Sequence, residues 1–273
     1  MNRQTGQDRM DIASIRRDLI AEQDALDAIV ASLTPEQWLL PTPSVRWSVA
    51  DQIAHLTYFD DAAVVAIADT DVFVTKMGEL LAIAPDGDVA MDERTLGSLR
   101  SVPTEDLLGT WRTNRRRLAE ASLGLDESRR LPWYGPPMGA KSFLTARLME
   151  TWAHGQDIVD AIAVDRPASD RLAHIARLGF LTRGWSYTNR GLQQPAESVR
   201  LELTSPSGAI WVFGPDDATE FVSGPALDFC LVVTQRRHVN DTSLVATPFA
   251  VEWLEIAQAF AGPPTSGPTA RID

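Results

Sequence analysis

Four polar side chains between positions 147 and 157 have a spacing that places them on one face of an α-helix. Arg147, Glu150, His154 and Asp157 are separated by three, four and three residues, and such residues are neighbours on a helix surface. The adjoining positions are mostly apolar, so we expect this face to point at least partly into a protein core. A carboxylate and an imidazole four residues apart can converge on one divalent metal ion inside a helical bundle.

The same stripe has a purely structural interpretation. Burying polar groups is costly unless they pair or bind something. Arg147 could pair with Glu150 and Asp157 with His154, which would give a closed ionic network. His55 favours the metal interpretation, because it lies in the middle of a second amphipathic pattern and the whole chain has four histidines. A metal site that combines His55 with Glu150 and His154 is therefore a better interpretation than either segment supports alone.

The elements that must position these residues are predicted helices. Helical spacing of apolar residues predicts helices over about 12–32, 48–70, 104–122 and 141–163, and Ser48 is a suitable N-cap for the second of them. Four such helices indicate an antiparallel bundle. Residues 72–81 suggest a short helix. Residues 84–102 and 124–140 contain proline and glycine and suggest loops, residues 1–11 suggest a frayed end, and residues 169–189 suggest a fifth helix.

The pattern changes period after Pro195. Val199, Leu201 and Leu203 alternate with polar residues, and a Ser-Pro-Ser-Gly turn precedes the apolar segment 210–213, so we expect a β-hairpin. Residues 220–222 suggest a third strand, and 224–237 and 249–260 suggest helices. The prediction is an α+β protein with a helical bundle over 1–194 and a small α/β domain over 195–273, which includes an extended tail.

Two segments together carry a family resemblance. Trp47-Ser48-Val49, Asp51 and His55-Leu56 are followed about ninety residues later by Arg147, Glu150, His154 and Asp157. This combination resembles the mycothiol-dependent maleylpyruvate isomerase family, within the DinB-like metal-binding superfamily. The resemblance implies a DinB-like four-helix bundle followed by a small sterol-carrier-like α/β domain.

The resemblance also implies roles for individual residues. The family pattern of one histidine and a Glu-x-x-x-His pair falls on His55, Glu150 and His154. Asp51, Arg147 and Asp157 are then expected to orient the imidazoles and balance charge. Participation of the second domain is implied too, so Arg236 or Arg237 is a candidate for contacting a substrate carboxylate, although charges that complement a helix end are the simpler explanation of these arginines.

Two histidines and one glutamate leave open coordination positions, which suit catalysis better than structural support. Zinc is the first expectation, and nickel, iron and manganese also accept these ligands. The resemblance implies mycothiol, or another low-molecular-weight thiol, as co-substrate. Its thiolate would add to an activated double bond, and elimination after bond rotation would give the isomer. Cys230 lies in an apolar helical stretch and is expected to be a buried, inert thiol.

The composition argues against a nucleic-acid-binding protein, a disulfide-linked protein and a membrane-spanning protein. The 25 basic and 37 acidic residues give a net charge of −12, which disfavours binding to a phosphate backbone. With one cysteine, no intramolecular disulfide can form. No apolar run is long enough to span a bilayer and no signal peptide is evident, so we expect a cytoplasmic protein with a small-molecule substrate. The oligomeric state is left open between monomer and homodimer.

Three functions remain open from the sequence. The first is a metal- and thiol-dependent isomerase or thiol transferase acting on a small organic acid or an activated metabolite. The second is a non-catalytic protein that binds a metal and a small ligand. The third is a metal-dependent hydrolase, in which bound water is the nucleophile. Open coordination positions and nearby charged groups favour the first.

Overall fold

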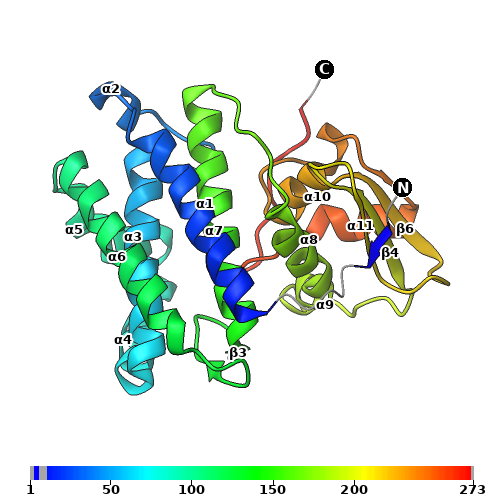
Figure 1. The fold of residues 1–273 in the computed structure, drawn as a ribbon, viewed down its shortest axis with the longest axis horizontal. Helices are drawn as coiled ribbons and strands as arrows, with labels where there is room; N and C mark the ends of the chain where they lie inside the picture. Colours follow the sequence, from blue (N-terminus) through cyan, green and yellow to red (C-terminus); the bar gives the residue numbers. More distant parts are fainter. Residues whose placement is uncertain (1–2, 6–10, 272–273) are drawn as a thin grey trace. The chain divides into compact units, whose positions relative to one another are not determined.

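The computed structural model describes residues 3–5 and 11–271. The chain divides into two compact units. One is helical and comprises residues 11–166; the other contains a sheet and comprises residues 167–273 together with the N-terminal segment that includes residues 3–5. Figure 1 shows the elements of each unit.

Long helices make up most of the helical unit. They are α1 (Ile12–Val30), α3 (Val49–Ala68), α4 (Thr70–Ile83), α5 (Asp88–Arg100), α6 (Thr104–Ala121) and α7 (Ala140–Ile162), with α2 (Pro35–Trp38) as a short turn and η1 (Ala84–Asp86) and η2 (Ser122–Gly124) as 3₁₀ segments. Helix α3 packs mainly on α6, and α1 mainly on α7. Helices α3 and α7 also contact each other, which joins the two pairs into one bundle (Figure 1).

The start of α3 is fixed by a capping box. The Ser48 hydroxyl accepts a hydrogen bond from the backbone N–H of Asp51, and the Asp51 carboxylate accepts one from the backbone N–H of Ser48, so two donors that lack intrahelical partners are satisfied. Val49, Ile53 and Leu56 on the inner face are fully buried. Each such side chain contributes roughly 1.5–3 kcal/mol relative to an exposed one.

Helix α7 is buried along most of its length. Leu144, Leu148 and Ile158 are completely covered, and they lie beside the polar stripe that the sequence singled out. The helix ends at Ala163, which has a left-handed backbone with φ of 54°. A left-handed backbone breaks the run of right-handed helical dihedral angles, so α7 stops at this point.

Two segments that were expected to be loops contain regular structure. Residues 88–100 form α5, although few of its positions are apolar; ion pairs from Arg46 to Asp92 and from Arg100 to Asp51 attach it to the rest of the unit. Residues 130–131 (β2, Arg130–Leu131) and 138–139 (β3, Met138–Gly139) form a two-stranded antiparallel ribbon.

The second unit is built on a five-stranded sheet in the order β1-β5-β4-β6-β7. Its strands are β1 (Arg3–Thr5), β4 (Val199–Thr204), β5 (Ile210–Phe213), β6 (Glu220–Pro225) and β7 (Val245–Ala246), and its helices are α8 (Leu172–Leu181), α9 (Arg183–Thr188), α10 (Ala226–Val233) and α11 (Pro248–Ile256), with η3 (Val239–Asp241). The predicted hairpin is present, with Leu201 opposite Phe213 and Leu203 opposite Trp211 in an antiparallel pair. Strand β6 runs parallel to β4 on its other side.

The N-terminal end departs from its predicted frayed state. Residues 3–5 form β1, which pairs in parallel with β5, and Asp11 caps α1 by accepting a hydrogen bond from the Ser14 backbone N–H. The remaining residues of 1–10 lie outside the described part of the chain.

The structure places the boundary between the units at 166/167, not at the predicted 194/195. The predicted fifth helix is two helices, α8 and α9, and it belongs with the sheet. The Cys230 thiol in α10 contacts the Leu172 carbonyl at 3.6 Å, and Gly179 lies so close to Val233 that an added Cβ would stand 2.7 Å from it. Tertiary packing, which local periodicity does not report, sets this boundary.

The predicted fold class, α+β with an N-terminal helical bundle and a small α/β unit after it, is confirmed. Across residues 3–5 and 11–271, each helix is too short or too polar to cross a lipid bilayer.

Candidate metal centre

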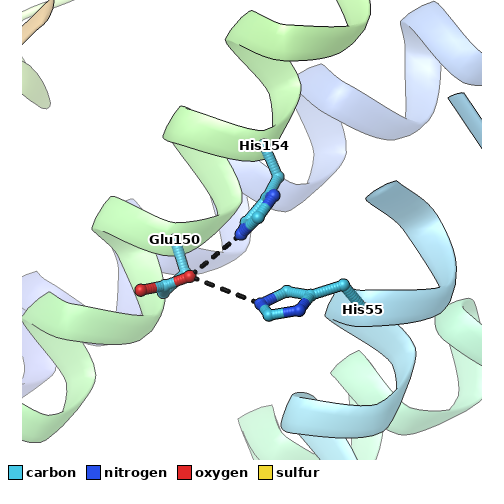
Figure 2. Close-up of side chains that lie close together, drawn as sticks. All are labelled: His55, Glu150 and His154. Atoms are coloured by element: carbon cyan, nitrogen blue, oxygen red, sulfur yellow. Dashed lines mark hydrogen bonds and ion pairs between the residues drawn. The ribbon is translucent and has the colours of Figure 1, made fainter. Parts of the chain in front are cut away.

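His55, Glu150 and His154 converge at the contact between α3 and α7. The Glu150 Oε2 atom lies 3.1 Å from His154 Nε2 and 3.6 Å from His55 Nε2. One ligand atom from each residue falls within 4.8 Å of the other two. Figure 2 shows that His154 and Glu150 project from successive turns of α7 and that His55 reaches them from α3.

These separations fit a divalent cation. Bonds of about 2.0–2.1 Å in a tetrahedral arrangement put neighbouring ligand atoms roughly 3.3 Å apart, and the measured 3.1 and 3.6 Å lie on either side of that value. Two imidazole nitrogens and one carboxylate oxygen form a donor set that zinc and other first-row metals accept. With three protein ligands, a four- or five-coordinate cation keeps positions for an exogenous ligand.

The electrostatics of the cluster favour the protonation states that metal binding needs. Burial lowers the pKa of His55 to about 3, and the neighbouring His154 adds to the effect, so His55 is neutral at neutral pH. Burial opposes ionisation of Glu150, but its interactions with the neighbouring imidazoles of His154 and His55 outweigh it and hold the pKa of Glu150 well below its usual range. A neutral imidazole and an ionised carboxylate are the metal-binding forms.

The cluster is sheltered but reachable. The side chains of Glu150 and His55 are 22% and 17% exposed, so one edge of the site meets solvent. The Trp47 ring lies 5.0 Å from that of His55 and is stacked 5.9 Å from that of His154. Phe59 covers His55 at 4.5 Å. Apolar walls of this kind lower the local dielectric around bound charges.

The neighbours of His154 differ from those expected. The Nδ1 atom lies 2.5 Å from Oε1 of Gln52, and 4.0 Å from Oδ2 of Asp157. The Asp157 oxygen accepts a hydrogen bond from the Ser44 hydroxyl at 3.1 Å. Asp157 therefore lies near the imidazole but beyond hydrogen-bonding distance of it, and Gln52 is the direct partner.

Arg147 does not pair with Glu150. Its guanidinium donates two hydrogen bonds, of 2.9 and 3.2 Å, to Asp60 on α3, and both side chains are almost completely buried. Asp60 also accepts a hydrogen bond from Gln23. The closed network of Arg147 with Glu150 is thus absent, and the guanidinium that was expected to support the imidazoles forms a buried ion pair with Asp60.

Asp51 also has a structural role. Its Oδ2 atom completes the α3 capping box, and its Oδ1 atom accepts a hydrogen bond of 2.7 Å from Arg100. It therefore contributes to helix capping and to the attachment of α5, and none of these bonds reaches an imidazole of the cluster.

Arg236 and Arg237 follow α10 in the unit that contains the sheet. Nη1 of Arg236 donates to the Thr234 carbonyl at 2.6 Å, and Nη1 of Arg237 donates to the Arg236 carbonyl at 2.7 Å. Contact of either arginine with a substrate carboxylate stays a prediction.

Two aromatic residues of the segment before α7, Trp133 and Tyr134, contact each other and both contact Phe73. Trp133 is a packing anchor, stacked on Phe73 at 5.5 Å and set edge-on against Phe143. Tyr134 lines a cavity of about 210 Å³ together with Tyr58 and Phe73. None of the three predicted ligands lines this cavity.

Gln52 and Asp60 were missed by sequence reasoning. Both lie on α3 within two turns of His55, at positions three before and five after it. Spacing could have placed Gln52 on the helix face of His55, since residues three apart are neighbours. No local signal could have assigned Asp60 to Arg147, because that contact joins two helices distant in sequence.

Comparison with known proteins identifies the family of this chain. The model of the mycothiol maleylpyruvate isomerase N-terminal domain matches residues 19–159, a range that includes all three predicted ligands. An uncharacterized protein of Mycobacterium tuberculosis, found in two strains, is 45% identical over 251 residues, which cover 92% of this chain and 96% of the relative.

Solved structures show the same fold. Crystal structures of the mycothiol-dependent maleylpyruvate isomerase and of a histidine-to-alanine variant of it match with TM-scores of 0.58 and 0.61. Both are 14% identical to this chain, and the match covers 96% of it and 99% of each of them. The resemblance inferred from the two helix motifs is confirmed, and the chain belongs to the family defined by the mycothiol maleylpyruvate isomerase N-terminal domain.

Proposed function

We propose that this protein is a divalent-metal-dependent, mycothiol-dependent isomerase or thiol transferase that acts on a small organic acid or an activated metabolite. The observation that carries the proposal is the convergence of His55, Glu150 and His154 at a partly exposed edge of the bundle. Three protein ligands with open positions are typical of catalytic sites, whereas structural sites are closed by four. Family membership supports mycothiol as the thiol.

In this proposal His55, Glu150 and His154 hold the metal. Zinc is the first candidate, with nickel, iron and manganese as alternatives. The bound cation would supply a Lewis acid that stabilises a thiolate at neutral pH. Trp47 and Phe59 cover the imidazoles and so limit the access of water to the reacting groups.

The thiol must come from outside the chain. Cys230 is completely buried, and burial raises its pKa well above the usual value, so it is a poor nucleophile. The proposed partners are accordingly small molecules, a thiol and an organic substrate, in the cytoplasm, and neither nucleic acid nor a membrane is among them.

Metal content tests the site first. We expect about one equivalent of zinc per wild-type chain after dialysis against zinc and then buffer, and loss of most of it in His55→Ala, Glu150→Ala and His154→Ala. His238→Ala is the matched control, because this histidine caps η3 in the other unit, and its zinc content should equal that of the wild type. Unchanged zinc in all three site variants would refute the ligand assignment.

Thiol binding tests the chemistry next. Adding mycothiol to cobalt-substituted protein should produce the absorption of a thiolate bound to cobalt, and maleylpyruvate is the first substrate to assay. Cys230→Ser should retain the spectrum and the activity, whereas Glu150→Ala should lose both. Metal-loaded protein that shows no spectral response to mycothiol would contradict the thiol-dependent proposal and favour hydrolysis or binding.

A further inference from the structure

A chain of hydrogen bonds runs from His154 to a backbone carbonyl. His154 Nδ1 lies 2.5 Å from Gln52 Oε1, Gln52 Nε2 donates to Thr42 Oγ1 at 2.8 Å, and Thr42 Oγ1 donates to the Trp47 carbonyl at 2.9 Å. Gln52 is completely buried. A buried amide is tolerated only when its hydrogen-bonding groups are satisfied, and here both ends of the amide have partners.

The Trp47 carbonyl, at the end of this series of hydrogen bonds, determines which atom donates in each of them. A backbone carbonyl accepts and cannot donate, so the Thr42 hydroxyl proton points to Trp47 and its lone pair faces Gln52. That lone pair takes an N–H of the Gln52 amide, which leaves Oε1 facing His154. Since Oε1 only accepts, His154 Nδ1 must carry the proton, and the lone pair of a neutral imidazole is then on Nε2, the nitrogen that faces Glu150.

The partner of His154 is a neutral amide and not a carboxylate. Asp157 Oδ2 is 4.0 Å from Nδ1 and is hydrogen-bonded to Ser44. A carboxylate that shared the Nδ1 proton would increase the basicity of the imidazole and donate more charge to the metal. With an amide there, Glu150 is the anionic ligand of the three, and a divalent cation held by them keeps a net positive charge.

We propose that Gln52 is a positioning residue that fixes the metal-binding tautomer of His154 and, because it is neutral, leaves the site electropositive enough to take an anionic exogenous ligand such as a thiolate. This inference deepens the proposed function and rests on it for the identity of the ligand. The orientation of His154 is a property of the cation-free protein and is separately measurable.

Zinc affinity is the first readout. Competition with a chromophoric chelator should show that Gln52→Leu binds zinc about 10- to 100-fold more weakly than the wild type. Gln23→Leu is the matched control: Gln23 is also a buried glutamine on a bundle helix, but its amide contacts Asp60, and its zinc affinity should be unchanged. Equal affinities in Gln52→Leu and the wild type, with both folded, would overturn the proposal.

Gln52→Glu separates positioning from charge. The variant keeps an acceptor toward Nδ1, so it should retain zinc, but the added negative charge should raise the apparent pKa for mycothiol binding to the zinc-loaded protein. A pH profile of mycothiol binding that is identical to that of the wild type would refute the role of the neutral amide.

The imidazole tautomer gives a readout that needs no metal. Long-range ¹H–¹⁵N correlation spectra of the cation-free wild type, above the pKa of its histidines, should show His154 protonated at Nδ1, and Gln52→Leu should move that proton to Nε2, beside Glu150. If the wild type binds no zinc, the proposed function fails, and this spectrum still decides the orientation. A proton on Nε2 in the wild type would overturn the inference.

Discussion

Two clusters of charged side chains lie one turn apart on α7, and both contact α3. They differ in whether their polar atoms are satisfied within the protein or are accessible to an added ligand. The Arg147–Asp60 pair is closed: its side chains are 2% and 0% exposed, and each neutralises the other. The cluster of His55, Glu150 and His154 is open: Glu150 is its anionic member, and its outer edge is exposed. Helix α7 therefore carries a structural ion pair and a candidate ligand site side by side.

The comparison shows that burial and charge alone do not identify a functional site. The Arg147–Asp60 pair is the more buried of the two, yet it is the less suitable for binding or catalysis, because its hydrogen-bonding groups are satisfied within the protein. What distinguishes the candidate site is the convergence of several lone pairs on one point with access from solvent. Arg147 and Glu150 are equivalent in the helical pattern, and the partner on α3 decides which becomes structural.

The largest expected effect comes from breaking the closed pair. Arg147→Met leaves Asp60 buried without its counter-charge, which should lower the free energy of unfolding by about 3–5 kcal/mol. Burial already raises the pKa of Asp60 and the Arg147 guanidinium opposes this, so the unpaired carboxyl should take up a proton more readily. Urea unfolding measures the loss.

Two controls sharpen this result. Arg94→Met removes an ion pair with Glu79 in which both side chains are at least half exposed, and it should cost less than about 1 kcal/mol. The double variant Arg147→Met with Asp60→Leu removes both buried charges and should be more stable than Arg147→Met alone. A loss in Arg147→Met no larger than that in Arg94→Met would contradict the structural role of the closed pair.

The cluster of His55, Glu150 and His154 should make the free energy of unfolding depend on pH. The pKa of His55 is about 3 in the folded protein and 6.5 ordinarily, so between these values the unfolded chain binds the extra proton. Stability of the metal-free protein must then fall as the pH drops below about 6.5. The depressed pKa of Glu150 acts in the same direction below its ordinary 4.5.

Urea midpoints measured in the presence of a chelator between about pH 7 and pH 5 test this dependence. His55→Gln removes the titrating imidazole and keeps a polar side chain, so its stability should change less over that range. Parallel profiles for the two proteins would show that His55 is not held neutral by its surroundings.

The smallest effect is expected at the start of α3. Ser48→Ala removes one half of the capping box and should cost about 1 kcal/mol, while zinc affinity should stay at the wild-type value, because Ser48 and Asp51 contact each other and not the imidazoles. Calorimetric unfolding and zinc titration together check this. A large drop in the zinc affinity of Ser48→Ala would indicate that Asp51 does orient the imidazoles, as the sequence predicted.

The sequence predicted those features that depend on residues close together in the chain. Glu150 and His154 lie four residues apart on a strongly periodic helix, so their common face could be predicted, and the Ser48 cap could be read from residue types alone. His55 was assigned through the family motif. The contact of Gln52 with His154 and the contact of Asp60 with Arg147 both join α3 to α7. They depend on how the two helices pack, and spacing within one helix does not specify this packing.

Helix α5 and the boundary between the units were missed for related reasons. The segment 88–100 has a glycine at Gly97 and few apolar residues; Leu96 is its fully buried hydrophobic side chain, and much of its attachment comes from ion pairs such as that of Arg100 with Asp51. Helix α8 has an apolar face like those of the bundle helices, but that face packs on α10. Amphipathic patterns show that a face is buried and not what buries it.

The contact between α3 and α7 has a consequence for how the helical unit comes apart. The unit is made of two main helix pairs, α3 with α6 and α1 with α7, and His55 lies on one pair while Glu150 and His154 lie on the other. A cation shared by these residues would act as a cross-link that closes the long chain segment between positions 55 and 154, and closing a long loop restricts the unfolded chain strongly. The bundle should then unfold more cooperatively when it is loaded, whereas without the cation the two pairs are joined by the packing of α3 on α7 and by the Arg147–Asp60 ion pair.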